Sequence, residues 1–204
     1  MAYSGPRMCL IGTLLMSLSA CAVQPTRMID ARADHSGYGM GLDDRDFTTA
    51  AQDAVQKMIE SGALNHPGGR RYVVAISRIS NETMQRIDTD QLVKKIRVAI
   101  LNSGKAVVTT AIGANGAEDD MTMRVRELRT SEEFSKANLA HKGEMVAPEL
   151  SLSGKLIQND TVVDGGQRVD YAFQLTLTDL RSGLGLWENE TPIAKLGTNR
   201  TVAW

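Results

Sequence analysis

One side chain in this sequence has neighbours that suit a covalent modification, the thiol of Cys21. It follows two small residues, Ser19 and Ala20, with Leu18 before them, so that Leu18-Ser-Ala-Cys21 resembles the bacterial lipobox. Small side chains before the cysteine let a signal peptidase approach the backbone, and the sulfur then carries a diacylglycerol. We therefore expect Cys21 to be the lipid-bearing N-terminus of the mature chain.

The segment before Cys21 has the layout of a signal peptide. Arg7 is its only charged residue, and the apolar run from Met8 to Leu18 is eleven residues long. That length suits a signal h-region but is too short to span a bilayer, which takes about 20 residues. Residues 1–20 are therefore predicted to be removed. The alternative is an ordinary signal peptide whose cysteine stays unmodified.

Cysteine usage and sorting agree with a lipid anchor. Cys9 leaves with the signal and Cys21 is acylated, so the mature chain has no free thiol for a disulfide, a metal or nucleophilic catalysis. Acyl chains such as palmitate anchor a protein by about 0.8 kcal/mol per buried methylene. Ala22 replaces the aspartate that retains lipoproteins in the inner membrane. We expect the periplasmic face of the outer membrane.

Other side chains that could do chemistry are not arranged for it. Asp43, Asp44 and Asp46 could bind a cation, but acidic residues also suit the first turn of a helix, which we favour. The glycines of residues 37–41 fit a linker better than a phosphate-binding loop. The histidines lack metal-site spacing: His35, His66 and His141. We expect no metal, no cofactor and no enzyme.

Composition indicates one globular domain after a tether. Residues 22–42 carry scattered charges and glycines without apolar periodicity, and residues 43–204 suffice for a single core. Aromatic residues make up only 4% of the chain, so this core must consist mainly of aliphatic side chains and methionine. Without Arg7 the chain has 22 basic and 24 acidic side chains, which gives no reason to expect nucleic-acid binding.

Two helices follow from apolar periodicity. The first is predicted from Asp43 to Gly62, with one apolar face: Phe47, Ala50, Ala51, Ala54, Val55, Met58 and Ile59. The second is predicted from Asp88 to just before Gly104, with another such face: Leu92, Val93, Ile96, Ala99 and Ile100. Residues 118–140 are charged and predict one broken helix or two short ones.

Five strands and their turns complete the expected fold. The strands are predicted at residues 71–79, 105–112, 150–156, 171–178 and 184–190. Residues 80–86 are predicted as a loop, and Asp164-Gly-Gly166 as a hairpin turn. A first half that alternates strand and helix, followed by an antiparallel half, predicts an α/β (α+β) fold: a single domain with a mixed β-sheet and helices packed on it.

Four segments together resemble the LpoB family of outer-membrane lipoproteins. They are Ile79-Ser-Asn-Glu-Thr-Met-Gln-Arg-Ile-Asp88, Ser151-Leu-Ser-Gly-Lys-Leu156, Tyr171-Ala-Phe-Gln-Leu-Thr-Leu177 and Asp179-Leu-Arg-Ser-Gly-Leu-Gly-Leu-Trp187. The resemblance covers most of residues 42–196. It implies a domain similar to the N-terminal domain of TolB. It also implies a non-enzymatic protein that binds and stimulates a bifunctional peptidoglycan synthase, a class A penicillin-binding protein.

The predicted tether departs from the family pattern. Well-known members have a long proline-rich tether, whereas this one has about twenty residues and only Pro25. It spans roughly 70 Å when fully extended and about 25 Å as a coil. A synthase in the inner membrane is harder to reach with this tether. The alternative is therefore an assembly subunit of a flagellar or secretion structure, whose partners could lie at the outer membrane.

The candidate partner-binding residues lie at the start of the second helix. Lys94, Lys95 and Arg97 fall outside its apolar face, and Met84 lies in the loop before it. A solvated basic face is the simpler interpretation. A docking surface is the functional one, because methionine adapts to binding surfaces and a charged rim suits a reversible interface. We predict that Met84, Lys94 and Lys95 contribute to the partner site.

Overall fold

The computed structural model describes residue 30 and residues 39–163 and 165–198. The chain divides into two units, Met1–Gly37 and Tyr38–Trp204, and the fold below belongs to the second. The predicted signal peptide, the lipobox with Cys21 and most of the predicted tether lie outside the described residues. Their assignment stays a prediction.

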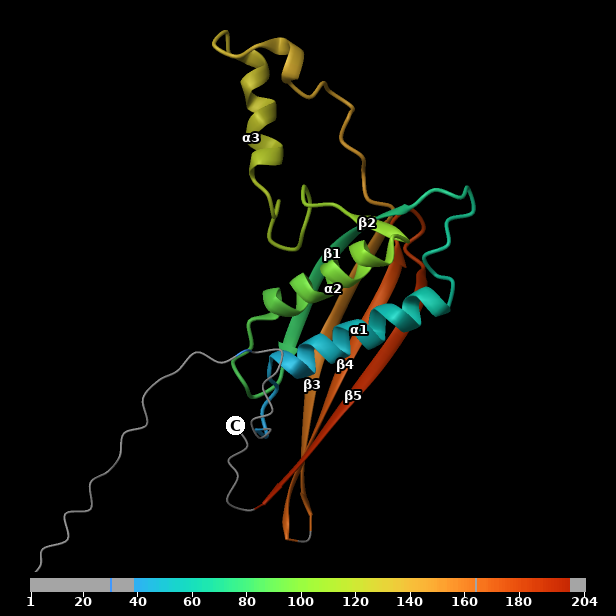
Figure 1. Cartoon of the computed structure of the whole chain (residues 1–204), viewed down its shortest axis with the longest axis vertical. Helices are drawn as coiled ribbons and strands as arrows, with labels where there is room; N and C mark the ends of the chain where they lie inside the picture. The colour runs from blue at the N-terminus through green and yellow to red at the C-terminus, as the bar shows by residue number, and fades with distance from the viewer. Residues whose placement is uncertain (1–29, 31–38, 164, 199–204) are drawn as a thin grey trace, which may run out of the picture. The chain divides into compact units, whose positions relative to one another are not determined.

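A five-stranded mixed sheet organises the second unit (Figure 1). Its strands are β1 (Tyr72–Glu82), β2 (Ala106–Val108), β3 (Leu150–Val163), β4 (Gly166–Asp179) and β5 (Gly185–Thr198). Their spatial order is β2-β1-β3-β4-β5; β1 pairs in parallel with β2 and β3, and β4 pairs antiparallel with β3 and β5. The structure confirms the predicted single α+β domain with a mixed sheet.

The first helix, α1 (Asp44–Glu60), begins with a capping box. The Asp43 carboxylate accepts hydrogen bonds from the backbone N–H groups of Arg45 and Asp46, and the Asp46 carboxylate accepts one from the Asp43 N–H. These bonds satisfy donors that have no partner inside the helix. The buried residues of α1 form the predicted apolar face: Phe47, Ala50, Ala51, Ala54, Val55 and Met58.

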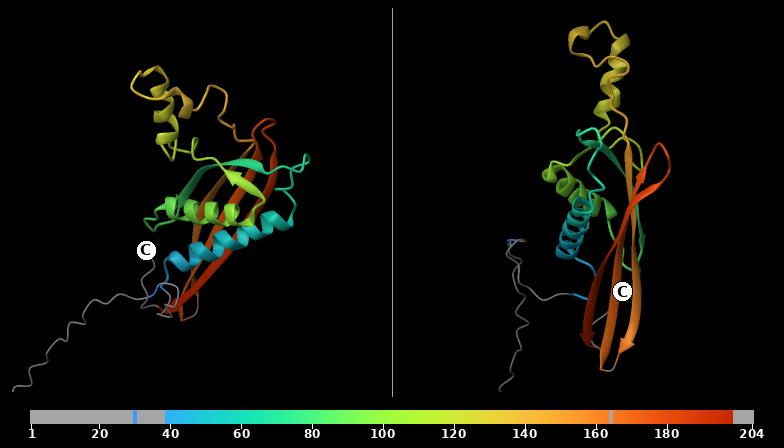
Figure 2. Two further views of the ribbon diagram at one scale, coloured as in Figure 1. Left: turned by 45° about the horizontal axis from the view of Figure 1, so that its top comes forward. Right: turned by 90° about the vertical axis from the view of Figure 1, so that its right-hand side faces the viewer.

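The second helix, α2 (Thr89–Ser103), confirms both predicted ends. The Asp88 side chain accepts a hydrogen bond from the Asp90 N–H, and Gly104 closes the helix in the left-handed conformation at φ +68°. Leu92, Ile96 and Ile100 are buried. Both helices cover the same face of the sheet (Figure 2), and alternate residues of β4, Val169 to Leu177, are buried on one face. Among the described residues, no helix covers the opposite face.

Four strand predictions were too short because tertiary pairing continues beyond the apolar pattern. β3 runs to Val163 instead of Leu156, and β4 begins at Gly166 instead of Tyr171, since the two strands pair along their whole length. β1 runs to Glu82, through residues predicted as a loop, since Asn81 and Glu82 pair with Leu156 and Ile157 of β3. β5 runs to Thr198 instead of Glu190, since residues 191–198 also pair with β4 along their whole length. Strand propensity depends on such partners more than on the segment itself.

The strand predicted at residues 105–112 was too long. β2 contains only Ala106–Val108, because the chain then folds back on itself: the Thr110 carbonyl oxygen accepts hydrogen bonds from the N–H groups of Glu118 and Asp119. The following charged region forms the predicted short helices. They are α3 (Met121–Glu127), η1 (Leu128–Thr130) and η2 (Lys136–Asn138).

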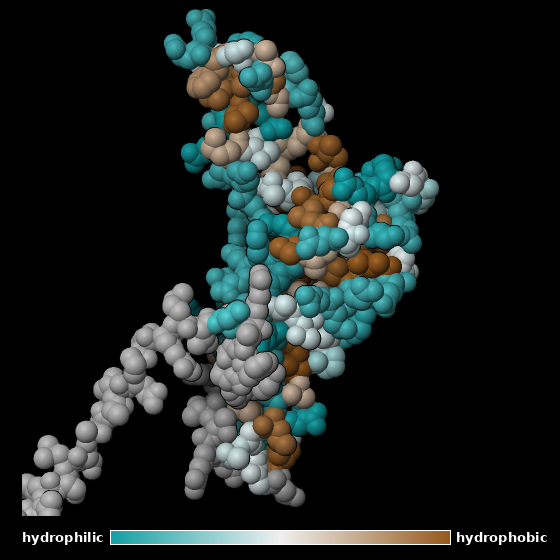
Figure 3. All heavy atoms as spheres, viewed as in Figure 1, coloured by the Kyte–Doolittle hydropathy of each residue, from teal (hydrophilic) through white to brown (hydrophobic). Residues whose placement is uncertain are grey.

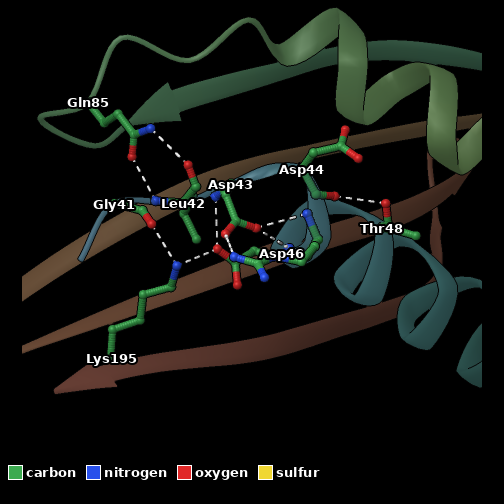
Figure 4. A network of polar contacts seen from close by, with 9 residues as sticks. Gly41, Leu42, Asp43, Asp44, Asp46, Thr48, Gln85 and Lys195 are labelled. Atoms are coloured by element: carbon green, nitrogen blue, oxygen red, sulfur yellow. Dashed lines mark hydrogen bonds and ion pairs between the residues drawn. The ribbon is translucent and has the colours of Figure 1, made fainter. Parts of the chain in front are cut away.

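The last residues of the predicted tether, just before α1, pack against the domain. Met40 and Leu42 are both buried in the core. Gln85 exchanges two hydrogen bonds with the Leu42 backbone, at 2.8 and 2.9 Å, and Lys195 Nζ donates to Gly41 O at 2.6 Å (Figure 4). The loop before α2 and strand β5 therefore hold the chain where it enters α1.

Gln85→Ala should lower the free energy of unfolding by about 1–2 kcal/mol, because it leaves the N–H and the carbonyl of the buried residue Leu42 without partners. Urea denaturation followed by circular dichroism measures this change. Gln91→Ala is the matched control, since Gln91 is exposed on α2. Equal stability of the two variants would contradict the anchoring role of Gln85.

Candidate functional site: a basic groove at the sheet edge

A groove of about 410 Å³ lies where β1, α2 and the segment after β2 meet. Residues 76–79 of β1 contribute one wall, Asp90, Val93, Lys94 and Arg97 of α2 another, and residues 113–118 the third. A hollow of about 600 Å³ elsewhere is bordered by Gly39 and Thr198, the ends of the described ranges, so its surroundings are only partly described.

The groove runs beside an open edge of the sheet. β2 pairs only with Tyr72–Val74 of β1, and the contact ends with the hydrogen bond from the Thr109 N–H to Val74 O at 2.9 Å. Beyond Val74, no strand within the described ranges pairs with this side of β1. Residues 75–82 of β1 thus form an open edge of the sheet with a length of about 26 Å, at ~3.3 Å per residue.

The side chains of the groove carry more positive than negative charge. Three are cationic, Arg78, Lys94 and Arg97, and two are acidic, Asp90 and Glu118. Arg97 pairs with Glu118 through Nη2, and its buried Nε has no hydrogen-bond partner. Within the described part of the chain, no carboxylate lies within 4.0 Å of the Arg78 or Lys94 cation. These two exposed cations are available to an acidic partner.

The structure brings together only part of the predicted partner site. Lys94 is exposed and lines the groove, whereas Lys95, one residue on, forms an ion pair with Asp44 of α1 at 2.8 Å. A shallow neighbouring hollow contains both lysines. Met84 is 71% exposed but does not line either of them; its N–H donates to Gln158 Oε1 of β3 at 3.1 Å. Binding by these residues stays a prediction.

Sequence reasoning missed Arg78. It falls inside the strand predicted at residues 71–79, yet it is exposed, and the pairing of β1 with β3 shifts register between Ile76 and Ile79 around it. A charged residue that interrupts an apolar strand is a signal for an edge or a bulge, because both features occur where a sheet meets solvent. The sequence contains this signal, but Arg78 was interpreted only as one residue of a strand.

The aspartates near α1 are engaged in structural contacts. Asp43 caps the helix, Asp44 pairs with Lys95, and Asp46 pairs with Lys195 at 2.5 Å. The described residues contain no group of three or more histidine, cysteine, aspartate or glutamate side chains that could hold a metal ion. Burial near the Asp160 and Asp46 carboxylates raises the pKa of Tyr171, whose hydroxyl donates to Met40 O. This cluster therefore anchors the chain.

A second charged cluster joins the starts of β1 and β3. Arg70 binds Glu149 through both terminal nitrogens, and His66 lies 3.5 Å from the same carboxylate with its ring edge against Tyr72. Hydrogen bonds from Arg70 lower the pKa of Glu149. The pair is partly exposed, so it contributes little to stability. It positions the loop before β1.

Another exposed surface contains apolar side chains on and after α3. Met121, Met123 and Phe134 are each about half exposed or more, and brown residues gather around α3 in Figure 3. Met123 therefore provides a matched exposed methionine for comparison with Met84. Across the described ranges, no helix has the length and apolar character needed to cross a membrane.

The chain belongs to the LpoB family. The family model, described as peptidoglycan-synthase activator LpoB, matches residues 46–193. This range includes α1 except Asp44 and Arg45, all of α2, strands β1 to β4, and β5 as far as Ile193. This match confirms the family suggested by the sequence segments. No curated protein sequence matches the chain significantly.

Solved structures similar to this chain include two LpoB structures and a lipoprotein from a third bacterium. The LpoB C-terminal domain from Salmonella enterica is 16% identical, with a TM-score of 0.44 over 72% of this chain and 98% of that one. LpoB from Escherichia coli is 14% identical, with a TM-score of 0.41 over 95% and 91%. Lipoprotein GNA1162 from Neisseria meningitidis is 14% identical, with a TM-score of 0.34 over 63% and 88%. The family assignment rests on the family model.

Proposed function

We propose that this protein is a lipid-anchored activator that binds and stimulates a bifunctional peptidoglycan synthase, a class A penicillin-binding protein, without catalysing a reaction itself. The match of residues 46–193 to a family described as peptidoglycan-synthase activators carries the proposal. The basic groove beside β1 adds a surface with unpaired cations that suits recognition of another protein.

The anchor follows from the N-terminal sequence. Cys21 carries the lipid after removal of residues 1–20, and Ala22 directs the protein to the periplasmic face of the outer membrane. Because Met40 lies in the core, the tether consists of residues 22–39. Fully extended, it spans about 60 Å. The domain then meets its synthase within that distance of the outer membrane.

Purified synthase should polymerise and cross-link lipid II faster when the mature chain, with Cys21→Ser replacing the lipidated residue, is added. Rates of glycan polymerisation and peptide cross-linking measure this directly. An unchanged rate at saturating protein, together with no complex in pull-down, would overturn the proposal. Mass spectrometry of the membrane-extracted protein tests the anchor, and an unacylated Cys21 would exclude it.

The predicted site is tested by the triple variant Met84→Ser, Lys94→Glu, Lys95→Glu. It should stay folded with a slightly lower melting temperature, because Lys95→Glu removes the partly exposed ion pair with Asp44, and it should lose most of the stimulation. The matched control is Met123→Ser, Lys105→Glu, Lys142→Glu, whose three residues are exposed away from the groove. Full stimulation by the folded triple variant would place the site elsewhere.

The short tether favours one alternative function, an assembly subunit of a flagellar or secretion structure at the outer membrane. Burial of Met40 and Leu42 in the core shortens the tether further and so favours partners close to that membrane. Pull-down of the mature chain from envelope extracts separates the two functions. Recovery of appendage proteins without a penicillin-binding protein would support assembly and contradict activation.

A further inference from the structure

The two edges of the sheet differ in their ability to accept another strand. β5, at one edge, carries Pro192 near its centre, and a proline has no N–H to donate to an added strand. β5 is also tied to α1 through the hydrogen bond from Thr191 Oγ1 to Asp53 Oδ2 at 2.8 Å. The uncovered stretch of β1, residues 75–82, contains no proline. In Figure 1, β1 is the green strand on the left-hand side of the sheet, behind α2.

The free edge of β1 is also where the cations of the groove gather. Arg78 projects from β1 itself, and Lys94 and Arg97 face the groove from α2. A segment lying along β1 in this groove would pass all three. Main-chain hydrogen bonds would hold it, and its side chains would be selected by the charges beside it, as in strand addition to other sheet edges.

From this arrangement we infer that an extended segment of the partner protein, bearing at least one aspartate or glutamate, adds as a strand to residues 76–80 of β1 within the groove. This inference names the mode of binding and rests on the proposed function for the identity of the partner. The acidic side chain pairs with Arg78 and Lys94, the groove cations that have no carboxylate within 4.0 Å among the described residues.

Arg97 provides a second contact for the same segment. It binds Glu118 through Nη2 alone, and its Nε is a buried donor without an acceptor, which is unfavourable. A carboxylate that binds an arginine side-on accepts from two of its nitrogens at once. A movement of residues 113–118 would let the partner's carboxylate satisfy Nε, so binding competes with the Arg97–Glu118 pair.

Residue-resolved hydrogen exchange tests strand addition. In the free mature chain, amides of residues 76–80 that face the open edge exchange fast, and addition of the purified class A penicillin-binding protein should slow them at least about tenfold. Amides of β5 serve as the internal control and should not change. Slow exchange of every one of these β1 amides in the free monomer would mean that the chain covers its own edge, and would overturn the inference.

Charge reversal tests the acidic segment. Arg78→Glu with Lys94→Glu should weaken binding at least about tenfold at low ionic strength, and the loss should shrink as salt screens the charges. Lys105→Glu with Lys142→Glu makes the same change in net charge away from the groove and should bind normally. Both variants must keep the melting temperature of the unmodified chain.

The outcomes separate the inference from the proposed function. If the unmodified chain does not bind the synthase, both the inference and the proposed function are wrong. If it binds, and the double variant binds equally well or residues 76–80 gain no protection, strand addition at β1 is wrong while activation stands. Light scattering of the free chain must give a monomer mass; a dimer that protects the same amides would show that a second copy, not a partner, occupies the edge.

Discussion

Gly154→Ala should lower the free energy of unfolding by about 1–3 kcal/mol or more, the usual range for overpacking of a close-packed site. Gly154 lies in β3 beside β4, and an added Cβ would stand 2.3 Å from the carbonyl oxygen of Gln174 and 2.7 Å from Leu175 Cδ2. The oxygen belongs to a strand paired on both sides, so it cannot move alone. Chemical denaturation of the purified domain measures the loss.

Gly185→Ala is the matched control for this change. Gly185 also lies in a strand, at the start of β5, but an added Cβ there meets no atom within 4 Å. The substitution should therefore be neutral, or stabilise slightly by restricting the unfolded chain. If Gly154→Ala proved as harmless as Gly185→Ala, the close contact between β3 and β4 would be wrong.

Lys195→Met should lower the free energy of unfolding by about 3–5 kcal/mol, the range seen when one partner of a buried ion pair is removed. The Lys195 and Asp46 side chains are only 8% and 11% exposed, and Lys195 Nζ also donates to Gly41 O. Methionine keeps an unbranched apolar stem, so the change removes the ammonium group together with its ion pair and its hydrogen bond to Gly41 O. The Asp46 carboxylate is then left buried without its cation.

Lys155→Met provides the comparison, because Lys155 is exposed on β3 and no carboxylate within the described ranges pairs with it. Thermal unfolding by calorimetry should show a clear drop for Lys195→Met and almost none for Lys155→Met. Equal melting temperatures would mean that water or a rearranged side chain compensates Asp46, and the buried pair would then contribute little.

The elements with their own periodicity were predictable from the sequence. The apolar face of α1 and the alternation along β4 each require burial on one side, and Asp88 and Gly104 mark the ends of α2 by their backbone chemistry. Elements that depend on distant partners were not predictable. Polar residues such as Asn81 are in a strand only because β3 lies beside them.

The candidate site was predicted in part for the same reason. Lys94 was recognised because its position on the helix excludes burial, and this follows from local geometry alone. The ion pair between Lys95 and Asp44 joins two helices, and the open edge beside Arg78 results from the early end of β2. Neither can be read from residue spacing, since each depends on how separate elements meet.

Attachment of the residues next to Met40 to three different elements has a mechanical consequence. Tyr171 of β4, Gln85 of the loop before α2 and Lys195 of β5 each hold a separate backbone group between Met40 and Leu42. A force applied to the chain on its N-terminal side would stretch these hydrogen bonds at the same time and would not break them one after another. Tension on the chain would therefore be shared among β4, β5 and the loop that joins β1 to α2, and separating the segment from the domain would require these bonds to break together.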